Sequence, residues 1–298
     1  MDKTDIFLTQ LLLVNSRLSY AELAKKLNLS VNAVHKRIQS LVEAGVIRRF
    51  TAKVSHFAVN SVQVFIYGNS QISNVHSLVD KLKTHRAIYW LAVGGGNYLY
   101  IGAYLREVHE LAALVSYVKE TAKMPEPTVG IQAPPPVLPA FNPDDRTLYA
   151  LDYQIIRALK DYSRKPISEV ADELRISAKT ARRRLNRLVK NGLIELSIEW
   201  YPDASNDILT LVQLQLTPDT DPVSAFKLLQ KYAPHMLFYW QFVNIPNLAT
   251  YAVWTSTMKE LQTIRESLEK EEGVLSVVPN VMYVGYIFNT WRDRLVDQ

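Results

Sequence analysis

Two segments of the chain carry polar side chains that suit contacts with nucleic acid. Lysine and arginine neutralise phosphates or donate to guanine, while asparagine and glutamine can pair with adenine edges in the major groove. The first segment offers Asn32, His35, Lys36 and Gln39. The second offers Lys179, Arg182, Arg183, Asn186 and Arg187. These residues are the candidate contacts to double-stranded DNA.

Apolar residues recur at helical spacing through both segments, which predicts a helix in each. The inward faces consist of Val34, Ile38 and Leu41 in the first segment and Ala181, Leu185 and Leu188 in the second. A serine precedes each helix as a cap and a glycine follows it as a stop. Shorter helices are expected near 19–27 and 167–174, so each segment forms a helix-turn-helix whose last helix is the recognition helix.

The two segments belong to an internal repeat with a constant offset of 147 residues. Ala21-Glu22-Leu23-Ala24 corresponds to Ser168-Glu169-Val170-Ala171, and the match continues through the two glycines, Gly45 and Gly192. A duplication fixes the architecture more firmly than any single motif does. The sequence therefore predicts two copies of one unit.

A short extended segment follows each recognition helix and has the character of a wing. The first wing is basic, and Arg48, Arg49 and Lys53 are candidate DNA contacts there. The second wing is acidic because it carries Glu195 and Glu199. We therefore expect the first copy to depend more on its wing and the second more on its helix.

Downstream of each helix-turn-helix, β-branched and aromatic runs alternate with helical patterns in the order strand, helix, strand, strand, helix, strand. This order is that of a ferredoxin-like unit. The expected strands lie near 61–68, 87–94, 97–105 and 128–133, then 208–216, 236–243, 248–255 and 274–286. The expected helices lie near 74–84, 107–121, 222–232 and 257–270.

The predicted fold class is α+β, with two winged helix-turn-helix domains alternating with two ferredoxin-like (βαββαβ) domains by tandem duplication. Prolines between the halves indicate a stiff linker. The predicted divisions are DNA-binding domain 1 at 1–54, ferredoxin-like domain 1 at 55–133, the linker at 134–146, DNA-binding domain 2 at 147–201 and ferredoxin-like domain 2 at 202–298.

Composition narrows the function classes. The chain of 298 residues contains no cysteine, which excludes disulfides, thiolate metal sites and thiol nucleophiles. The net charge of +5 permits a nucleic-acid partner. No apolar run reaches the length of a membrane span and the start lacks a secretory pattern, so we expect an intracellular, cytoplasmic protein without a membrane partner. The scattered histidines predict no metal site, and no cofactor is expected.

The pattern of residues in the first copy resembles that of the Lrp/AsnC (leucine-responsive) family of transcription regulators. The matching positions are Asp2, Asp5, Arg17, Glu22-Leu23-Ala24, Leu29-Ser30, Val34, Arg37, Leu41 and Gly45-Val46-Ile47. Family members join one DNA-binding domain to one ferredoxin-like domain and pair through their sheets. The resemblance implies two family units fused into a covalent pseudo-dimer that addresses two different half-sites. It also leaves room for a homodimer through the ferredoxin-like sheets.

The resemblance further implies a small-molecule effector, such as an amino acid or a related metabolite, near a turn between the second and third strands. The candidate effector residues are Gly95, Gly96, Asn97 and Tyr98. The same glycine-rich stretch is also what a plain hairpin requires. Both interpretations stay open at this point.

Two rival functions share this architecture. Siroheme decarboxylases resemble the family's fold, and such an enzyme would need cationic groups to hold a substrate with many carboxylates. His85, Arg86 and His109 are candidates in the first half, but only His235 in the second. Alternatively, the fold could serve assembly alone. Because both recognition faces are polar and largely basic, we expect a DNA-binding regulator and no enzyme.

Overall fold

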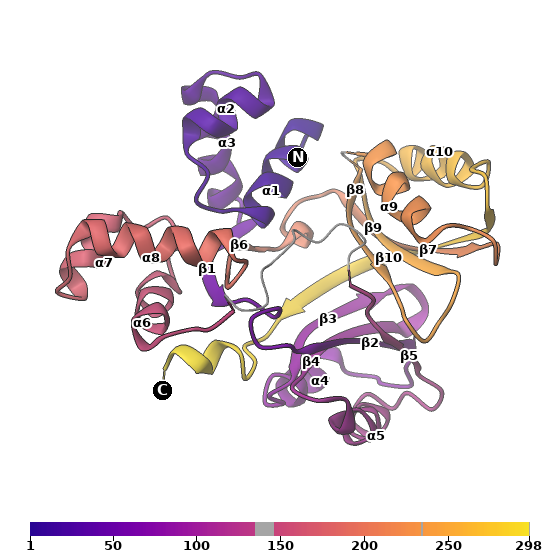
Figure 1. The fold of residues 1–298 in the computed structure, drawn as a ribbon. Coiled ribbons are helices and arrows are strands. Elements are labelled where there is room, and N and C mark those ends of the chain that lie inside the picture. Colours follow the sequence, from indigo (N-terminus) through magenta and orange to yellow (C-terminus); the bar gives the residue numbers. More distant parts are fainter. Residues whose placement is uncertain (135–145, 234, 298) are drawn as a thin grey trace. The chain divides into compact units, whose positions relative to one another are not determined.

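The computed structural model describes residues 1–134, 146–233 and 235–297 (Figure 1). It divides into two compact units, each assembled from separate stretches of chain. Unit 1 contains Met1–Ile6, Val62–Val137 and Ser205–Asn289, and unit 2 contains Phe7–Ser61, Leu138–Ala204 and Thr290–Gln298. The predicted linker at 134–146 lies almost entirely outside the described residues. The predicted α+β class is confirmed, whereas the division into four domains stays a prediction.

The first helix-turn-helix lies in unit 2, apart from the first turn of its leading helix. It consists of α1 (Lys3–Val14), α2 (Tyr20–Leu27) and α3 (Val31–Glu43). Helix α3 begins where the Ser30 hydroxyl accepts the Ala33 N–H at 3.1 Å. It ends before Gly45, whose φ of 74° belongs to the left-handed region that favours glycine. Both the predicted cap and the predicted stop are confirmed.

The second copy repeats this arrangement with α6 (Ala150–Leu159), α7 (Ile167–Glu173) and α8 (Ala178–Lys190). Ser177 accepts the Thr180 N–H at 3.1 Å, and Gly192 has a φ of 61°. Ala181, Leu185 and Leu188 are buried, as predicted for the inward face of α8. The copy therefore packs its recognition helix in the same way, with alanine in place of Val34.

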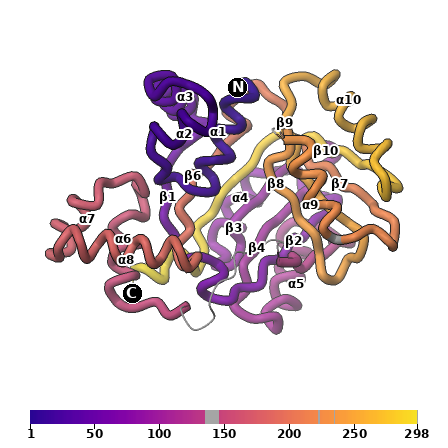
Figure 2. Tube along the Cα trace, turned by 45° about the horizontal axis from the view of Figure 1, so that its top comes forward, coloured from indigo at the N-terminus to yellow at the C-terminus, as the bar shows by residue number. Residues whose placement is uncertain are grey.

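The strands that follow the two recognition helices pair with each other. Strand β1 (Ile47–Val54) runs antiparallel to β6 (Ile194–Trp200), with Phe50 opposite Ile198 and Thr51 opposite Ser197. They form a separate two-stranded sheet between the two helical trios (Figure 2). The two expected wings are thus the two halves of one ribbon.

The last residues of the chain also belong to unit 2. A short 3₁₀ turn, η5 (Asp293–Val296), packs Val296 into the core of the second copy beside Ile155 and Leu159. Trp291 and Arg292 just before it are buried. The C-terminal segment is therefore an integral part of unit 2.

Unit 1 holds the two ferredoxin-like halves. The first half contains β2 (Val62–Asn69), α4 (Val75–Leu82), β3 (Ile88–Gly94), β4 (Tyr98–Leu105), α5 (Leu111–Thr121) and β5 (Thr128–Ile131). The second contains β7 (Ile208–Leu216), α9 (Pro222–Lys231), β8 (Met236–Gln241), β9 (Leu248–Thr255), α10 (Met258–Leu268) and β10 (Val274–Ile287). All eight strands and four helices predicted for this region are confirmed.

The two halves form one eight-stranded sheet in the order β5-β2-β4-β3-β10-β7-β9-β8. The long strand β10 pairs with β7 of its own half and with β3 of the other. The outer strands β5 and β8 also meet, because Ala133 N–H donates to the Gln241 carbonyl at 2.7 Å and Val243 N–H donates to the Ile131 carbonyl at 2.9 Å. Both sheet edges are thus engaged within one chain.

None of the residues in these eight strands is an Asp, Glu, Lys, Arg or His. On the face of the sheet away from the helices, aromatic rings are frequent, and the ring centroids of Phe65 and Trp240 lie 4.9 Å apart.

No helix among the described residues is both long and apolar enough to cross a bilayer. The described residues also contain no cluster of three or more potential metal ligands.

Candidate nucleic-acid interface

The outward face of α3 presents the polar residues predicted for the first copy. Asn32, His35, Lys36 and Gln39 are all exposed. The Gln39 amide donates to Glu43 at 2.9 Å, so it is held along the helix. The His35 ring lies 5.2 Å from that of Tyr20 on α2. This face is predominantly neutral and offers amide and imidazole groups rather than a dense positive charge.

The outward face of α8 is more strongly cationic. Lys179, Arg182, Arg183 and Asn186 are exposed, and Lys190 extends the positive charge to the end of the helix. The charges point away from the buried Ala181 and Leu185. Such a face suits phosphate contacts, because each cation can displace a condensed counterion from DNA.

Arg187 has a different environment from its neighbours on α8. Its guanidinium pairs with the buried carboxylate of Asp152 at 3.0 Å and donates to the Thr147 carbonyl at 2.6 Å. Arg184 lies near the same carboxylate at 3.8 Å. The structure thus gives Arg187, expected to contact DNA, a role in tying α8 to the start of α6. Arg184 contributes to the same structural contact.

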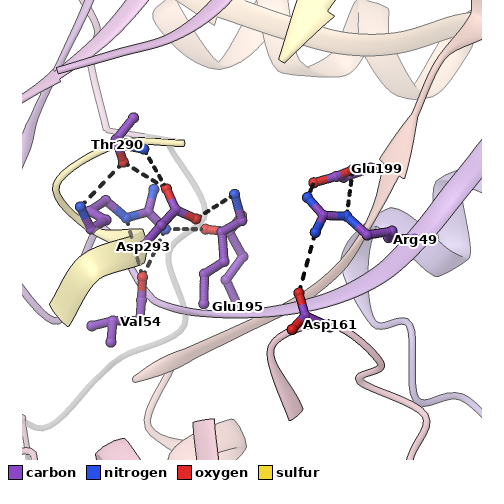
Figure 3. Close-up of polar contacts among 9 residues, drawn as sticks. Arg49, Val54, Asp161, Glu195, Glu199, Thr290 and Asp293 are labelled. Atoms are coloured by element: carbon purple, nitrogen blue, oxygen red, sulfur yellow. Dashed lines mark hydrogen bonds and ion pairs between the residues drawn. The ribbon is translucent and has the colours of Figure 1, made fainter. Parts of the chain in front are cut away.

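Arg49 of the first wing is paired within the ribbon. Its Nε donates to Glu199 at 2.9 Å, its Nη2 also pairs with that carboxylate, and its Nη1 lies 3.3 Å from Asp161 (Figure 3). Hydrogen bonding to Glu199 raises the pKa of Arg49, against the effect of burial. Arg48 is exposed too, but its guanidinium lies over an aromatic ring, 3.6 Å from the centre of Tyr201.

Lys53 is likewise engaged, in a cluster that holds the C-terminal segment. Its ammonium lies 2.8 Å from Asp293, which also accepts from Thr290 (Figure 3). The buried Arg292 donates to the Val54 carbonyl at 2.8 Å and to Glu195 at 2.7 Å. Lys53 and Arg49 are therefore occupied inside unit 2, and a free basic wing is not what the structure contains.

The charge difference between the two wings has a structural explanation that the sequence interpretation missed. In the register of the ribbon, Arg49 lies opposite Glu199 and Lys53 lies opposite Glu195. Opposite charges at facing positions stabilise antiparallel strands. The opposite charge of the two wings, basic in the first copy and acidic in the second, was the signal that could have predicted this pairing.

The two copies also meet at a pair of equivalent serines. The hydroxyl oxygens of Ser16 and Ser163, both fully buried, lie 2.6 Å apart. Around them the contacts are reciprocal: Arg17 donates to the carbonyls of Ser163 and Lys165, and Arg164 donates to those of Ser16 and Leu18. Each contact maps onto the other through the 147-residue offset. An approximate twofold axis therefore relates the copies within unit 2.

The candidate effector residues form a tight turn between β3 and β4. Gly96 has a φ of 68° and Asn97 a φ of 56°, which explains the glycine and asparagine there. The Gly95 N–H donates to Asn280 on β10 at 2.9 Å. Tyr98 is partly buried, and this burial raises its pKa. The structure therefore contains the predicted hairpin.

Sequence comparison places the chain among winged helix-turn-helix proteins. The family model described as winged helix-turn-helix DNA-binding matches residues 1–48 and 150–195. An uncharacterised HTH-type transcriptional regulator of Pyrococcus furiosus is 31% identical over 99 residues, which are 33% of this chain and 67% of the relative. The regulator LrpA of Pyrococcus horikoshii is 26% identical over 118 residues, which are 39% of this chain and 84% of the relative.

The chain belongs to the Lrp/AsnC family of HTH-type transcriptional regulators, with two family units in tandem. It spans about two thirds of the length of several of these curated relatives, 63 to 67%.

The whole chain also has the fold of a solved enzyme. The crystal structure of the siroheme decarboxylase NirDL aligns with a TM-score of 0.62 and 12% identity, covering 99% of this chain and 97% of that one. At this identity the likeness concerns the fold alone. It extends the match from one family unit to the tandem arrangement.

Proposed function

We propose that this protein is a sequence-specific DNA-binding transcription regulator that acts as a covalent pseudo-dimer. The observation that carries the proposal is the pair of recognition helices, α3 and α8, held in one compact unit with exposed polar faces. Each helix would enter the major groove of one half-site. Since the two faces differ in charge and in side chains, the preferred operator is asymmetric.

The proposed contacts divide by chemistry. In this proposal the larger part of the phosphate attraction comes from Lys179, Arg182 and Arg183 on α8, and Asn186 contacts a base edge. On α3, Asn32, Lys36 and Gln39 carry more of the base reading, with His35 beside Tyr20. Arg48 is the exposed wing residue that we assign to a backbone contact.

Binding-site selection from random duplexes with the purified full chain tests this function. We expect an operator with two unlike half-sites and an affinity that falls steeply as salt rises. A single recovered half-site, or two identical ones, would contradict the pseudo-dimer. Failure to enrich any sequence above input would contradict DNA recognition altogether.

We further propose that a small neutral or zwitterionic metabolite, such as an amino acid, modulates binding through the hairpin of Gly95, Gly96, Asn97 and Tyr98. Asn280 fixes the backbone of this turn, which would preorganise it for a ligand. Calorimetric titration of the chain with a panel of amino acids tests the idea. Wild-type binding that persists in the Tyr98→Ala variant would remove the hairpin from consideration.

A second candidate function is decarboxylation of an iron tetrapyrrole, favoured by the fold match over the whole chain. The residues fit it poorly. The strands of unit 1 carry no Lys, Arg or His, whereas a tetrapyrrole with many carboxylates needs cationic partners. A Soret band retained after gel filtration with iron uroporphyrin would support the enzyme, and its absence alongside DNA binding would support the regulator.

A further inference from the structure

Two equivalent arginines of unit 2 each reach across its twofold axis and bind the other copy. The Arg17 guanidinium donates to the Lys165 carbonyl at 2.8 Å, and that of Arg164 donates to the Ser16 carbonyl at 2.6 Å and the Leu18 carbonyl at 2.9 Å. These carbonyls lie in the turns just before α2 and α7. Each copy therefore holds the turn between the first two helices of the other copy.

These contacts restrict the relative position of the two copies more than they add attraction between them. Burial and the neighbouring Arg164 both lower the pKa of Arg17, so the two cations repel each other at the axis. Carbonyl acceptors from the opposite copy offset this repulsion, and each forked guanidinium donates to two of them. The Ser16–Ser163 contact at 2.6 Å adds a third point fixed at the axis.

One of the two arginines extends its influence to a recognition helix. Arg164 lies over the rings of Tyr20 and Phe50, 4.8 Å and 5.6 Å from their centres. The Tyr20 ring in turn lies 5.2 Å from that of His35 on the outward face of α3. A chain of direct contacts thus runs from the second copy to the DNA-facing side of the first.

We propose that Arg17 and Arg164 are positioning residues that fix the separation of α3 and α8, so that the protein selects operators by the spacing between their half-sites. This inference rests on the proposed DNA-binding function. A rigid pair of recognition helices can match one phase of the double helix, while independently tethered ones tolerate several.

The test uses the selected operator and derivatives with 2, 5 or 10 base pairs inserted between the half-sites. For the wild-type chain we expect insertion of 5 base pairs to weaken binding about 100-fold, because the second helix can no longer engage. For R17A/R164A we expect the same insertion to weaken binding less than about 10-fold. Affinity for an isolated half-site should be equal in the two proteins.

Two further variants separate positioning from folding. R17K/R164K keeps the charges but loses the forked geometry, so its spacing profile should lie between the other two. Adding S16C/S163C to R17A/R164A should restore the narrow profile after oxidation, because a covalent bond then holds the axis. R157A, which removes an exposed arginine of α6, serves as the matched control with the wild-type profile.

The possible outcomes separate the proposed DNA-binding function from the positioning role of the two arginines. If the wild-type chain selects no DNA, the proposed function fails. If it selects an operator and the wild type and R17A/R164A show the same spacing profile, the function stands and the positioning role is overturned. If R17A/R164A does not fold, an R17K/R164K profile identical to that of the wild type overturns it equally.

Discussion

The side chains of Ser16 and Ser163 meet at the twofold axis of unit 2, with 2.6 Å between their hydroxyl oxygens and 147 residues between them in the sequence. Because the chain contains no cysteine, the double substitution S16C/S163C creates a unique pair of thiols. We expect them to form an intramolecular disulfide on mild oxidation and to raise the melting temperature. The bond would close a loop of more than a hundred residues, where the expected gain is about 4 kcal/mol or less.

Non-reducing electrophoresis and thiol titration measure this bond. The single variants S16C and S163C are the controls and should each keep one free thiol. Two free thiols in the oxidised double variant would show that the serines do not face each other in solution.

The cationic face of α8 gives a prediction about salt dependence. Replacing Arg182 and Arg183 with alanine should weaken operator binding and reduce the slope of log affinity against log salt by about 2, since each lost phosphate contact contributes about 0.9. Fluorescence anisotropy at several salt concentrations measures the slope. K81A/R86A removes two exposed charges from unit 1 and should leave it unchanged. An unaltered slope in R182A/R183A would remove α8 from the interface.

The ribbon ion pair gives a prediction about stability. Arg49→Ala leaves the buried Glu199 carboxylate without its main partner, so the free energy of unfolding should fall by about 1–3 kcal/mol. Urea denaturation measures this loss. In R49A/E199A the loss should be smaller than the sum of the two single losses, because the stranded charge is gone. If Arg49→Ala instead reduced the slope of log DNA affinity against log salt and left the free energy of unfolding unchanged, Arg49 would be a DNA contact.

The cluster around Arg292 predicts acid sensitivity. Burial, aided by Arg292, lowers the pKa of His56 from 6.5 to about 4. In that pH range the unfolded chain binds the proton more readily than the folded one, so stability falls as pH decreases from 6.5 to about 4. Although burial opposes it, Lys53 and Thr290 lower the pKa of Asp293, and this contribution to stability disappears at still lower pH.

Melting temperatures between pH 7 and pH 4 check this expectation. His56→Gln should flatten the decline over the upper part of the range. His109→Gln, at an exposed position of unit 1, should retain the wild-type profile. An equally steep decline in the His56 variant would show that other groups control the acid response.

Local patterns were sufficient to predict the helices and the strands of unit 1. Ser30 and Ser177 lie at helix starts and Gly45 and Gly192 at helix ends because caps and left-handed stops depend on neighbouring residues. The faces of α3 and α8 followed from helical periodicity for the same reason. The DNA contacts proposed on those faces stay predictions.

Long-range partners were beyond the same reasoning. Three basic residues have the type expected of a DNA contact but form ion pairs with carboxylates 35 to 240 residues away in the sequence. The pairs are Arg49 with Glu199, Lys53 with Asp293 and Arg187 with Asp152. Only the complementary charges of the two wings hinted at one of these pairs. A basic residue on a plausible face is therefore weaker evidence than a basic residue shown to be unengaged.

The union of both copies in one chain has a consequence for how the protein would respond to its own concentration. Two separate chains must first associate, so at low expression the fraction of paired DNA-binding domains falls with dilution. Here the contacts between Arg17, Arg164 and the opposite carbonyls form within one molecule, and dilution does not separate them. Operator occupancy should then rise with the first power of the protein concentration, even at a few copies per cell.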